Sequence, residues 1–348
     1  MYKKMKNKIF LMAAVLFGLL AACTNDDQNF DDYEYSAVYF AYQFPVRTIT
    51  LGEDIFDTSL DNAHKCKIMG TLGGVYENNK DVTIDVSVAN SLTSNLLFKS
   101  GGDQIVAMPS NYYTLLSDKI VIPKGQISGG VEVQLTDAFF ADPLAIKKTY
   151  VIPLQMTKVM NADSILSGKA LVANPLRPLA SDWSVAPKDY VFYAIRYVNP
   201  WDGFYLRRGK DTFVGNNGNT ALNRVVSRHS QYVEKDQVNR INTLSMKTID
   251  FPVTIKDNTG ANINFNLVLT FDDNNGCTVS GNNSAQFTAT GTGKFVKRGE
   301  KNSWGSKDRD ALYLDYKVNF QNFSLTTQDT LVLRDRGVTA ELFTPVAK

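Results

Sequence analysis

Short alternating runs of hydrophobic and polar residues dominate the chain from Tyr35 onward. The clearest run is Val82 to Val88, in which Val and Ile alternate with Thr, Asp and Ser, as in a strand with one buried and one solvated face. Gly, Asn, Asp and Pro separate the runs, and no long 3.6-residue periodicity occurs. The pattern predicts an all-β protein.

The first group of runs predicts an immunoglobulin-like β-sandwich over residues 33–173. Turn signals such as Pro123-Lys124-Gly125 separate its short strands, and a helical turn is expected within 136–148. The predicted strands are 37–41, 66–72, 82–88, 119–122, 131–135, 149–156 and 168–172.

Pro175 and Pro178 predict a linker over residues 174–182, because proline is excluded from helix interiors and central strands. Beyond it, further runs predict a meandering antiparallel barrel over residues 183–344, since closure removes exposed sheet edges. Asn275-Gly276 predicts a hairpin within that barrel. The predicted strands are 190–198, 203–208, 221–226, 249–255, 263–271, 277–280, 287–295, 311–320 and 330–334.

The N-terminus has the pattern of an export signal. Lysines gather within Met1 to Lys8, and an apolar run follows from Ile9 to Leu20. That run is too short to span a bilayer, which needs about 20 residues. It ends in Leu20-Ala21-Ala22-Cys23, which resembles a bacterial lipobox. The resemblance implies a signal peptide at residues 1–22, lipid on Cys23 and membrane attachment through that lipid alone.

Residues 23–32 carry four aspartates and no basic residue, which indicates a solvated acidic tether. Acidic residues directly after a lipidated cysteine resemble the surface-export signal of Bacteroidetes-type lipoproteins. We therefore expect a lipid-anchored protein of the outer membrane, exposed at the cell surface.

The charge balance gives no electrostatic reason to expect nucleic acid as a partner. The 348 residues carry a formal net charge of +2, with 37 basic and 35 acidic residues. Without the four lysines of the signal peptide, 33 basic residues remain against 35 acidic ones, a formal charge of −2. Only Cys66 and Cys277 then remain as cysteines, and their apolar contexts predict buried free thiols.

No catalytic or cofactor motif stands out. The chain has two histidines, and HExxH, GxSxG, CxxC and P-loop patterns are absent, so neither cofactor nor metal is expected. A glycoside hydrolase would need paired carboxylates, but the region after the linker is too short for a (β/α)₈ barrel of about 250 residues. The Asp272-to-Gly276 segment favours turn chemistry over a calcium loop, because EF-hand spacing is missing.

The candidate ligand site is placed at the mouth of the predicted barrel. Trp304 lies in a polar loop without apolar neighbours and is either a sugar-stacking platform or a plug at the barrel end. Trp201 resembles the tryptophan that lipocalin-like barrels pack at their closed end against a late arginine, and the resemblance implies a structural role beside Arg334 or Arg336. The proposed ligand contacts are Trp304, Tyr232, Tyr205, Asp308 and Arg309.

Two groups of motifs resemble known families. The segments 112–125, 131–133 and 150–154 resemble an N-terminal domain of unknown function in Bacteroidetes-type surface lipoproteins, which also occurs ahead of family 18 glycoside hydrolases. The segments 201–209 and 329–338 are similar to a companion domain of unknown function with a lipocalin-like barrel. The resemblance implies a place in glycan utilisation and supplies no catalytic residues.

Three functions fit these observations. The leading expectation is a non-catalytic surface lipoprotein that binds glycans for a polysaccharide-utilisation system, beside an outer-membrane transporter. The second is a structural or adhesin-like surface component with protein partners and no affinity for sugars. The third, a glycoside hydrolase, is the least favoured because no catalytic pattern supports it.

Overall fold

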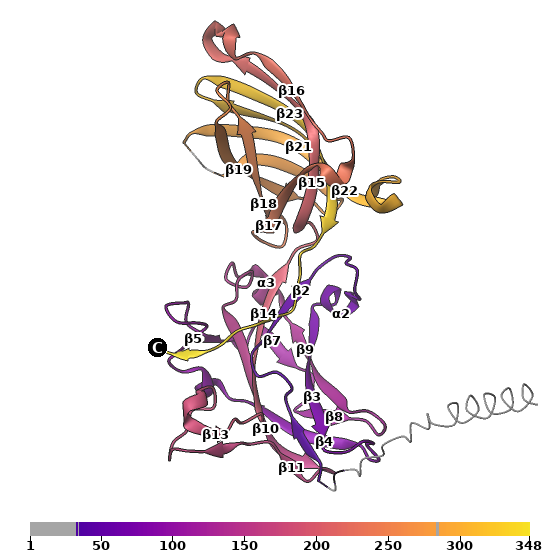
Figure 1. The fold of residues 1–348 in the computed structure, drawn as a ribbon, viewed down its shortest axis with the longest axis vertical. Coiled ribbons are helices and arrows are strands. Elements are labelled where there is room, and N and C mark those ends of the chain that lie inside the picture. The colour runs from indigo at the N-terminus through magenta and orange to yellow at the C-terminus, as the bar shows by residue number, and fades with distance from the viewer. Residues whose placement is uncertain (1–32, 34, 283–284) are drawn as a thin grey trace, which may run out of the picture.

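Two β-rich bodies, stacked end to end, make up the described part of the chain (Figure 1). The computed structural model describes residue 33 and residues 35–282 and 285–348. The predicted signal peptide, Cys23 and the tether of residues 23–32 lie outside the described residues. Strands dominate both bodies, and the α-helices α2 (Ser59–Asn62) and α3 (Asp137–Ala141) are short. The predicted all-β class, a sandwich followed by an antiparallel barrel, is confirmed.

Two packed sheets form the N-terminal sandwich. Across the first sheet the order is β11 (Ser164–Ile165), β1 (Ala37–Tyr39), β3 (Lys65–Gly73), β9 (Ser128–Leu135) and β7 (Tyr113–Leu115). Across the second it is β24 (Glu341–Leu342), β2 (Pro45–Thr50), β14 (Tyr190–Val198), β10 (Tyr150–Met160), β4 (Val82–Val88) and β8 (Lys119–Ile122), with β6 (Val106–Ala107) also on β10. Two short pairs are added, β12 (Lys169–Ala170) with β13 (Trp183–Val185), and β5 (Leu96–Leu97) with β25 (Val346–Ala347).

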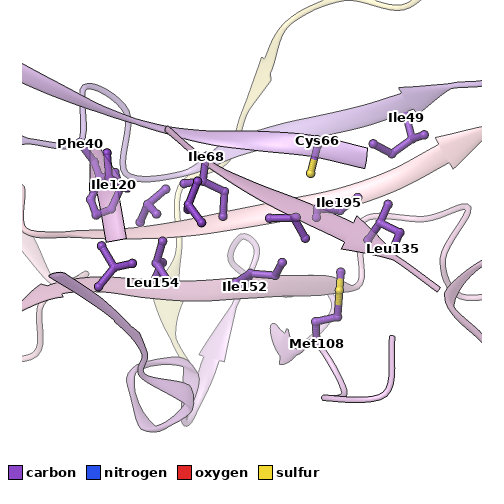
Figure 2. Close-up of a cluster of buried hydrophobic side chains, with 14 of the residues drawn as sticks. Phe40, Ile49, Cys66, Ile68, Met108, Ile120, Leu135, Ile152, Leu154 and Ile195 are labelled. Carbon is purple, nitrogen blue, oxygen red and sulfur yellow. The ribbon is translucent and has the colours of Figure 1, made fainter. Parts of the chain in front are cut away.

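Period-two alternation directs one face of each strand into the core between the two sheets. Figure 2 shows Cys66 and Ile68 of β3 opposite Ile152 and Leu154 of β10. Cys66, like Cys277 in the barrel, is a buried free thiol, as predicted. Burial raises the pKa of both thiols to about 12, which keeps them protonated and unreactive at neutral pH.

The strand β14 belongs to the sandwich, so the predicted domain boundary at 174–182 is wrong. It pairs with β10 on one edge and with β2 on the other. Val191 and Ile195 face the core between the sheets, while Phe192 and Ala194 face a second apolar cluster. Because both faces of β14 are covered by apolar residues and both of its edges are paired, it is an interior strand of the second sheet. The chain therefore passes into the barrel after β14, and the proline-rich segment is a loop of the first body.

The last residues return from the barrel to the sandwich, so the predicted barrel range of 183–344 is also too long at its end. β24 pairs with β2, and β25 pairs with β5. Phe343 is buried between Phe44 and Phe98, with ring centroids 5.5 and 4.9 Å away. The chain thus crosses between the bodies twice, which restricts their relative motion.

The second body is a closed antiparallel barrel with eight strand positions. β15 pairs with β23 to close it, while β16 and β17 pair with successive parts of the other edge of β15 and share one position. Asn275 has φ +61° in the hairpin between β19 and β20, as predicted. The strands are β15 (Gly203–Gly215), β16 (Arg224–Arg228), β17 (Gln237–Thr243), β18 (Thr248–Lys256), β19 (Asn262–Phe271), β20 (Gly276–Gly281), β21 (Phe287–Glu300), β22 (Arg309–Phe320) and β23 (Phe323–Asp335).

A single buried arginine, Arg336, ties the two bodies together. Its guanidinium donates to the carbonyl oxygens of Asn199 (2.6 Å) and Asp202 (2.6 Å) in the segment that enters the barrel. It also donates to those of Leu51 (3.1 Å) and Glu53 (3.2 Å) in a sandwich loop. Burial lowers the pKa of Arg336, and the four carbonyls offset the desolvation of its charge.

We predict that Arg336→Lys lowers the free energy of unfolding by about 3 kcal/mol, because one ammonium group cannot replace four guanidinium bonds and leaves buried carbonyls unpaired. Chemical denaturation of both proteins measures the difference. The control is Arg334→Lys, an exposed position where a change within about 0.5 kcal/mol is expected. Equal stability of the Arg336 variant and the parent protein would show that Arg336 does not tie the two bodies together.

We also predict that a cut between residues 171 and 176 leaves the two fragments associated. The downstream strand β14 stays hydrogen-bonded to β2 and β10 of the upstream fragment. An engineered protease site in this exposed loop, followed by size-exclusion chromatography, tests this. Co-elution in buffer and separation in denaturant are expected; separation in buffer would instead support a domain boundary in this loop.

Candidate functional site

Aromatic side chains fill the barrel interior at both ends, and the ligand site predicted at the barrel mouth stays a prediction. At one end Phe320 stacks on Phe323, with ring centroids 4.7 Å apart, and Phe287, Phe265 and Phe213 pack around them. A packed barrel of this size has no open lumen.

At the other end, Trp201 stacks on Phe271 at 3.8 Å and donates to the side-chain oxygen of Asn275. Trp201 is therefore the structural plug that the sequence favours. Asp272 accepts hydrogen bonds from the backbone N–H groups of Asn274 and Gly276, which confirms the turn interpretation of this segment. Among the described residues, no group of three potential metal ligands gathers anywhere.

Tyr205 is not a ligand contact. Its side chain is fully buried in the barrel core, and its hydroxyl donates to the carbonyl oxygen of Trp201 at 2.8 Å. The alternation along β15 turns this residue inward, so no solvent-borne ligand reaches it. Burial raises its pKa well above the usual range, and the phenol stays neutral.

Trp304 is half-buried at the end of the barrel that faces the sandwich, which we call the barrel base. The guanidinium carbon of Arg309 lies 3.4 Å from the centre of its ring, and its indole N–H donates to the carbonyl oxygen of Leu333 at 3.3 Å. Arg309 also donates to the carbonyl oxygen of Trp304 at 3.1 Å. One face of the indole is therefore occupied, and Trp304 holds Arg309 in place.

Tyr232 is exposed in the loop between β16 and β17. That loop joins the two strands that share one edge of β15. Tyr232 does not line the cavity that contains Asp308 and Arg309. The sequence candidates thus divide, with Asp308, Arg309 and Trp304 together at the barrel base and Tyr232 apart from them.

A cleft of about 510 Å³ opens between the barrel base and a loop of the sandwich. Its volume lies within the range of small-molecule sites. The loop contributes one wall through Glu53, Asp54, Ile55 and Phe56. The barrel contributes the other wall through Arg298, Asp308, Arg309, Asp310 and residues 333–339.

One charge pair bridges the two walls of the cleft, and a second lies within the barrel wall. Lys297 binds Glu53 across the junction at 2.6 Å, and this hydrogen bond lowers the pKa of Glu53. Asp308 accepts from Lys301 at 2.9 Å and from the backbone N–H of Asn302, and these bonds lower its pKa. Both carboxylates are therefore ionised and partnered at neutral pH.

Arg298 is the cleft residue with unused hydrogen-bonding capacity. It lies in a bulge of β21 and has φ +50°, a conformation in which a non-glycine residue is strained. Its backbone N–H donates to Asp310 at 2.7 Å. Its exposed guanidinium donates no hydrogen bond to any residue in the described part of the chain. The strained bulge therefore presents free donors to the cleft.

The apolar part of the cleft, Ile55 and Phe56, was not predicted from the sequence. Ile55 is 102% exposed and Phe56 is 39% exposed, on a loop that Arg336 anchors through Leu51 and Glu53. The sequence signal was present, because two large apolar residues between Asp54 and Asp57 cannot be buried by local patterning. The same reasoning selected Trp304, whose ring the structure shows to be partly covered.

Two family models match the chain, one in the sandwich and one in the barrel. A family model for a domain of unknown function, DUF5627, matches residues 200–337. A model for an N-terminal domain matches residues 31–163. A solved structure of a Bacteroides ovatus protein of unknown function is 49% identical, covers 91% of this chain and 100% of its own, and has a TM-score of 0.85. The chain belongs to this Bacteroides family of unknown function. The DUF5627 match begins at 200, beside the boundary that the structure sets.

The wider comparisons add little about function. A second Bacteroides ovatus structure of unknown function covers 89% of this chain and 99% of its own, at 12% identity and a TM-score of 0.39. The search among curated proteins found no match. No helix in the described ranges is both long and apolar enough to cross a bilayer.

Proposed function

We propose that this protein is a non-catalytic, lipid-anchored surface protein that binds glycans in the cleft between the sandwich and the DUF5627 barrel. The supporting observation is that the cleft sets an exposed apolar wall, Ile55 and Phe56, against the free guanidinium of Arg298. A sugar ring has an apolar face and a rim of hydroxyl groups, and such a two-sided surface complements both.

Two carboxylates of the cleft, Glu53 and Asp308, favour a binding role over hydrolysis. A glycosidase requires one carboxylic acid whose pKa is raised, so that it can protonate the leaving group. Glu53 and Asp308 have lowered pKa values instead, caused by their bonds to Lys297 and Lys301. Ionised carboxylates of this kind accept hydrogen bonds from sugar hydroxyls.

The proposed cellular location of the protein is supported by its N-terminal sequence. Leu20-Ala21-Ala22-Cys23 followed by four aspartates supports lipidation and display on the outer membrane, and a neighbouring outer-membrane transporter is the proposed partner.

We predict that Cys23→Ala moves the protein from the membrane fraction to the soluble fraction, because the lipid is its sole anchor in this proposal. Fractionation with immunoblotting measures the distribution, and mass spectrometry of the parent protein detects acylated Cys23 as the N-terminal residue. Cys66→Ala is the matched control and leaves the protein in the membrane fraction. Unchanged partitioning of the Cys23 variant would exclude a lipid anchor at this position.

For the cleft we predict that Phe56→Ala weakens binding of the best glycan about five- to thirtyfold, through loss of a stacking contact of about 1 to 2 kcal/mol. A glycan array identifies that ligand, and calorimetry measures its affinity for each variant. Arg298→Ala is expected to weaken binding by about tenfold.

Lys317→Ala, at an exposed position on β22, is the control and keeps the parent affinity. Tyr232→Ala tests the sequence candidate that lies outside the cleft. Glycan binding that survives both cleft substitutions would move the site elsewhere. If no glycan on the array binds, the adhesin-like alternative replaces this proposal.

A further inference from the structure

The barrel wall is interrupted where β16 and β17 share one strand position. β17 pairs with β18 through Asn242–Asp250 and Thr243–Ile249, and the described strand pairings of β16 involve β15 alone. A cavity of about 310 Å³ lies at this break, between β16 and the end of β18. Its size is at the lower end of the range for small-molecule sites, about 300 to 1,000 Å³.

A buried network of charges lies behind the opening. Arg228 binds Asp211 through Nε at 2.6 Å and Asp329 through Nη2 at 2.5 Å. Arg207 binds Asp329 at 2.8 Å, and the hydroxyl of Tyr316 donates to Asp329 at 2.9 Å. Two arginines and two aspartates balance each other, so the network is neutral within the barrel.

The network is costly to maintain inside the barrel. Buried ion pairs lose hydration that their mutual attraction only partly restores. The η1 nitrogens of Arg207 and Arg228 are buried without a hydrogen-bond partner among the described residues. Gly209 is required beside them, because a Cβ there would lie 2.6 Å from an oxygen of Asp329 and 2.2 Å from the carbonyl oxygen of Gln328. Arg228 also lines the cavity, so the network reaches the opening.

The rim of the opening carries surplus positive charge. Among the described residues, Arg224 donates only to neutral oxygens, the side chain of Asn258 and the carbonyl of Lys256. Its guanidinium lies 3.6 Å from the ring centre of Phe213. Lys256 lines the cavity with an exposed side chain. The one carboxylate in the lining, that of Asp211, is already neutralised by Arg228.

From these observations we propose that the opening between β16 and β18 binds a small carboxylate of about the size of one sugar residue. The carboxylate group lies between Arg224 and Lys256, where charge-assisted hydrogen bonds form. The body of the ligand packs on the apolar lining supplied by Val226 and Ile255. This site is separate from the cleft at the domain junction and does not depend on it.

Calorimetry with three carboxylates, glucuronate, galacturonate and benzoate, tests the proposal against their neutral counterparts glucose, galactose and benzamide. At least one carboxylate is expected to bind, about tenfold or more tightly than its neutral counterpart. Lys256→Gln and Arg224→Gln are each expected to weaken that binding about tenfold. Lys256 is exposed, so its substitution keeps the fold intact, which an unchanged melting temperature verifies.

Lys317→Gln, which removes an exposed charge elsewhere on the barrel, is the matched control and keeps the parent affinity. Phe56→Ala and Arg298→Ala of the cleft leave carboxylate binding unchanged, so failure of one site is distinguished from failure of the other. The proposal is overturned if no carboxylate binds, if neutral counterparts bind equally well, or if Lys256→Gln and Lys317→Gln have equal effects.

Discussion

The buried guanidinium of Arg336 is the interaction on which the relative placement of the two bodies depends. It is 4% exposed and donates to four carbonyl oxygens, two on the segment that enters the barrel and two on a sandwich loop. Backbone carbonyls cannot move away without moving their chain, so the charge fixes both segments at once. The loop that it anchors carries Ile55 and Phe56, and the cleft therefore has a preorganised apolar wall.

The barrel acts as a scaffold more than as a container. Its two ends are filled by the Phe320 cluster and by the Trp201–Phe271 stack, and its middle holds the ion network around Asp329. Two cavities lie at its margins, one at the base beside the sandwich and one at the break in the wall. Both positions occur where regular strand pairing is disturbed, by the bulge at Arg298 and by the division between β16 and β17. Such irregularities commonly free polar groups for function.

Several properties could be predicted from the sequence because they depend on local pattern. Alternation located β4 and β22, and the Asn-Gly pair located the hairpin after β19, since strand faces and turn types depend on neighbouring residues. The same local reasoning grouped Asp308 and Arg309 with Trp304 in one loop region, and the structure keeps them together. It failed for Tyr205, because alternation shows that a residue lies on one face but not which face turns inward.

Local sequence patterns were enough to predict the all-β class, the order of sandwich and barrel, most strand positions and the burial of the two thiols. The fold of the whole chain was needed to establish that β14 completes the sandwich, because the partners β2 and β10 that cover its edges lie far away in the chain. It also decided that Arg336 bridges two bodies and that Phe56 stays exposed while an arginine covers Trp304. These outcomes depend on pairings between residues separated by tens to hundreds of positions, and local periodicity carries no information about such pairings.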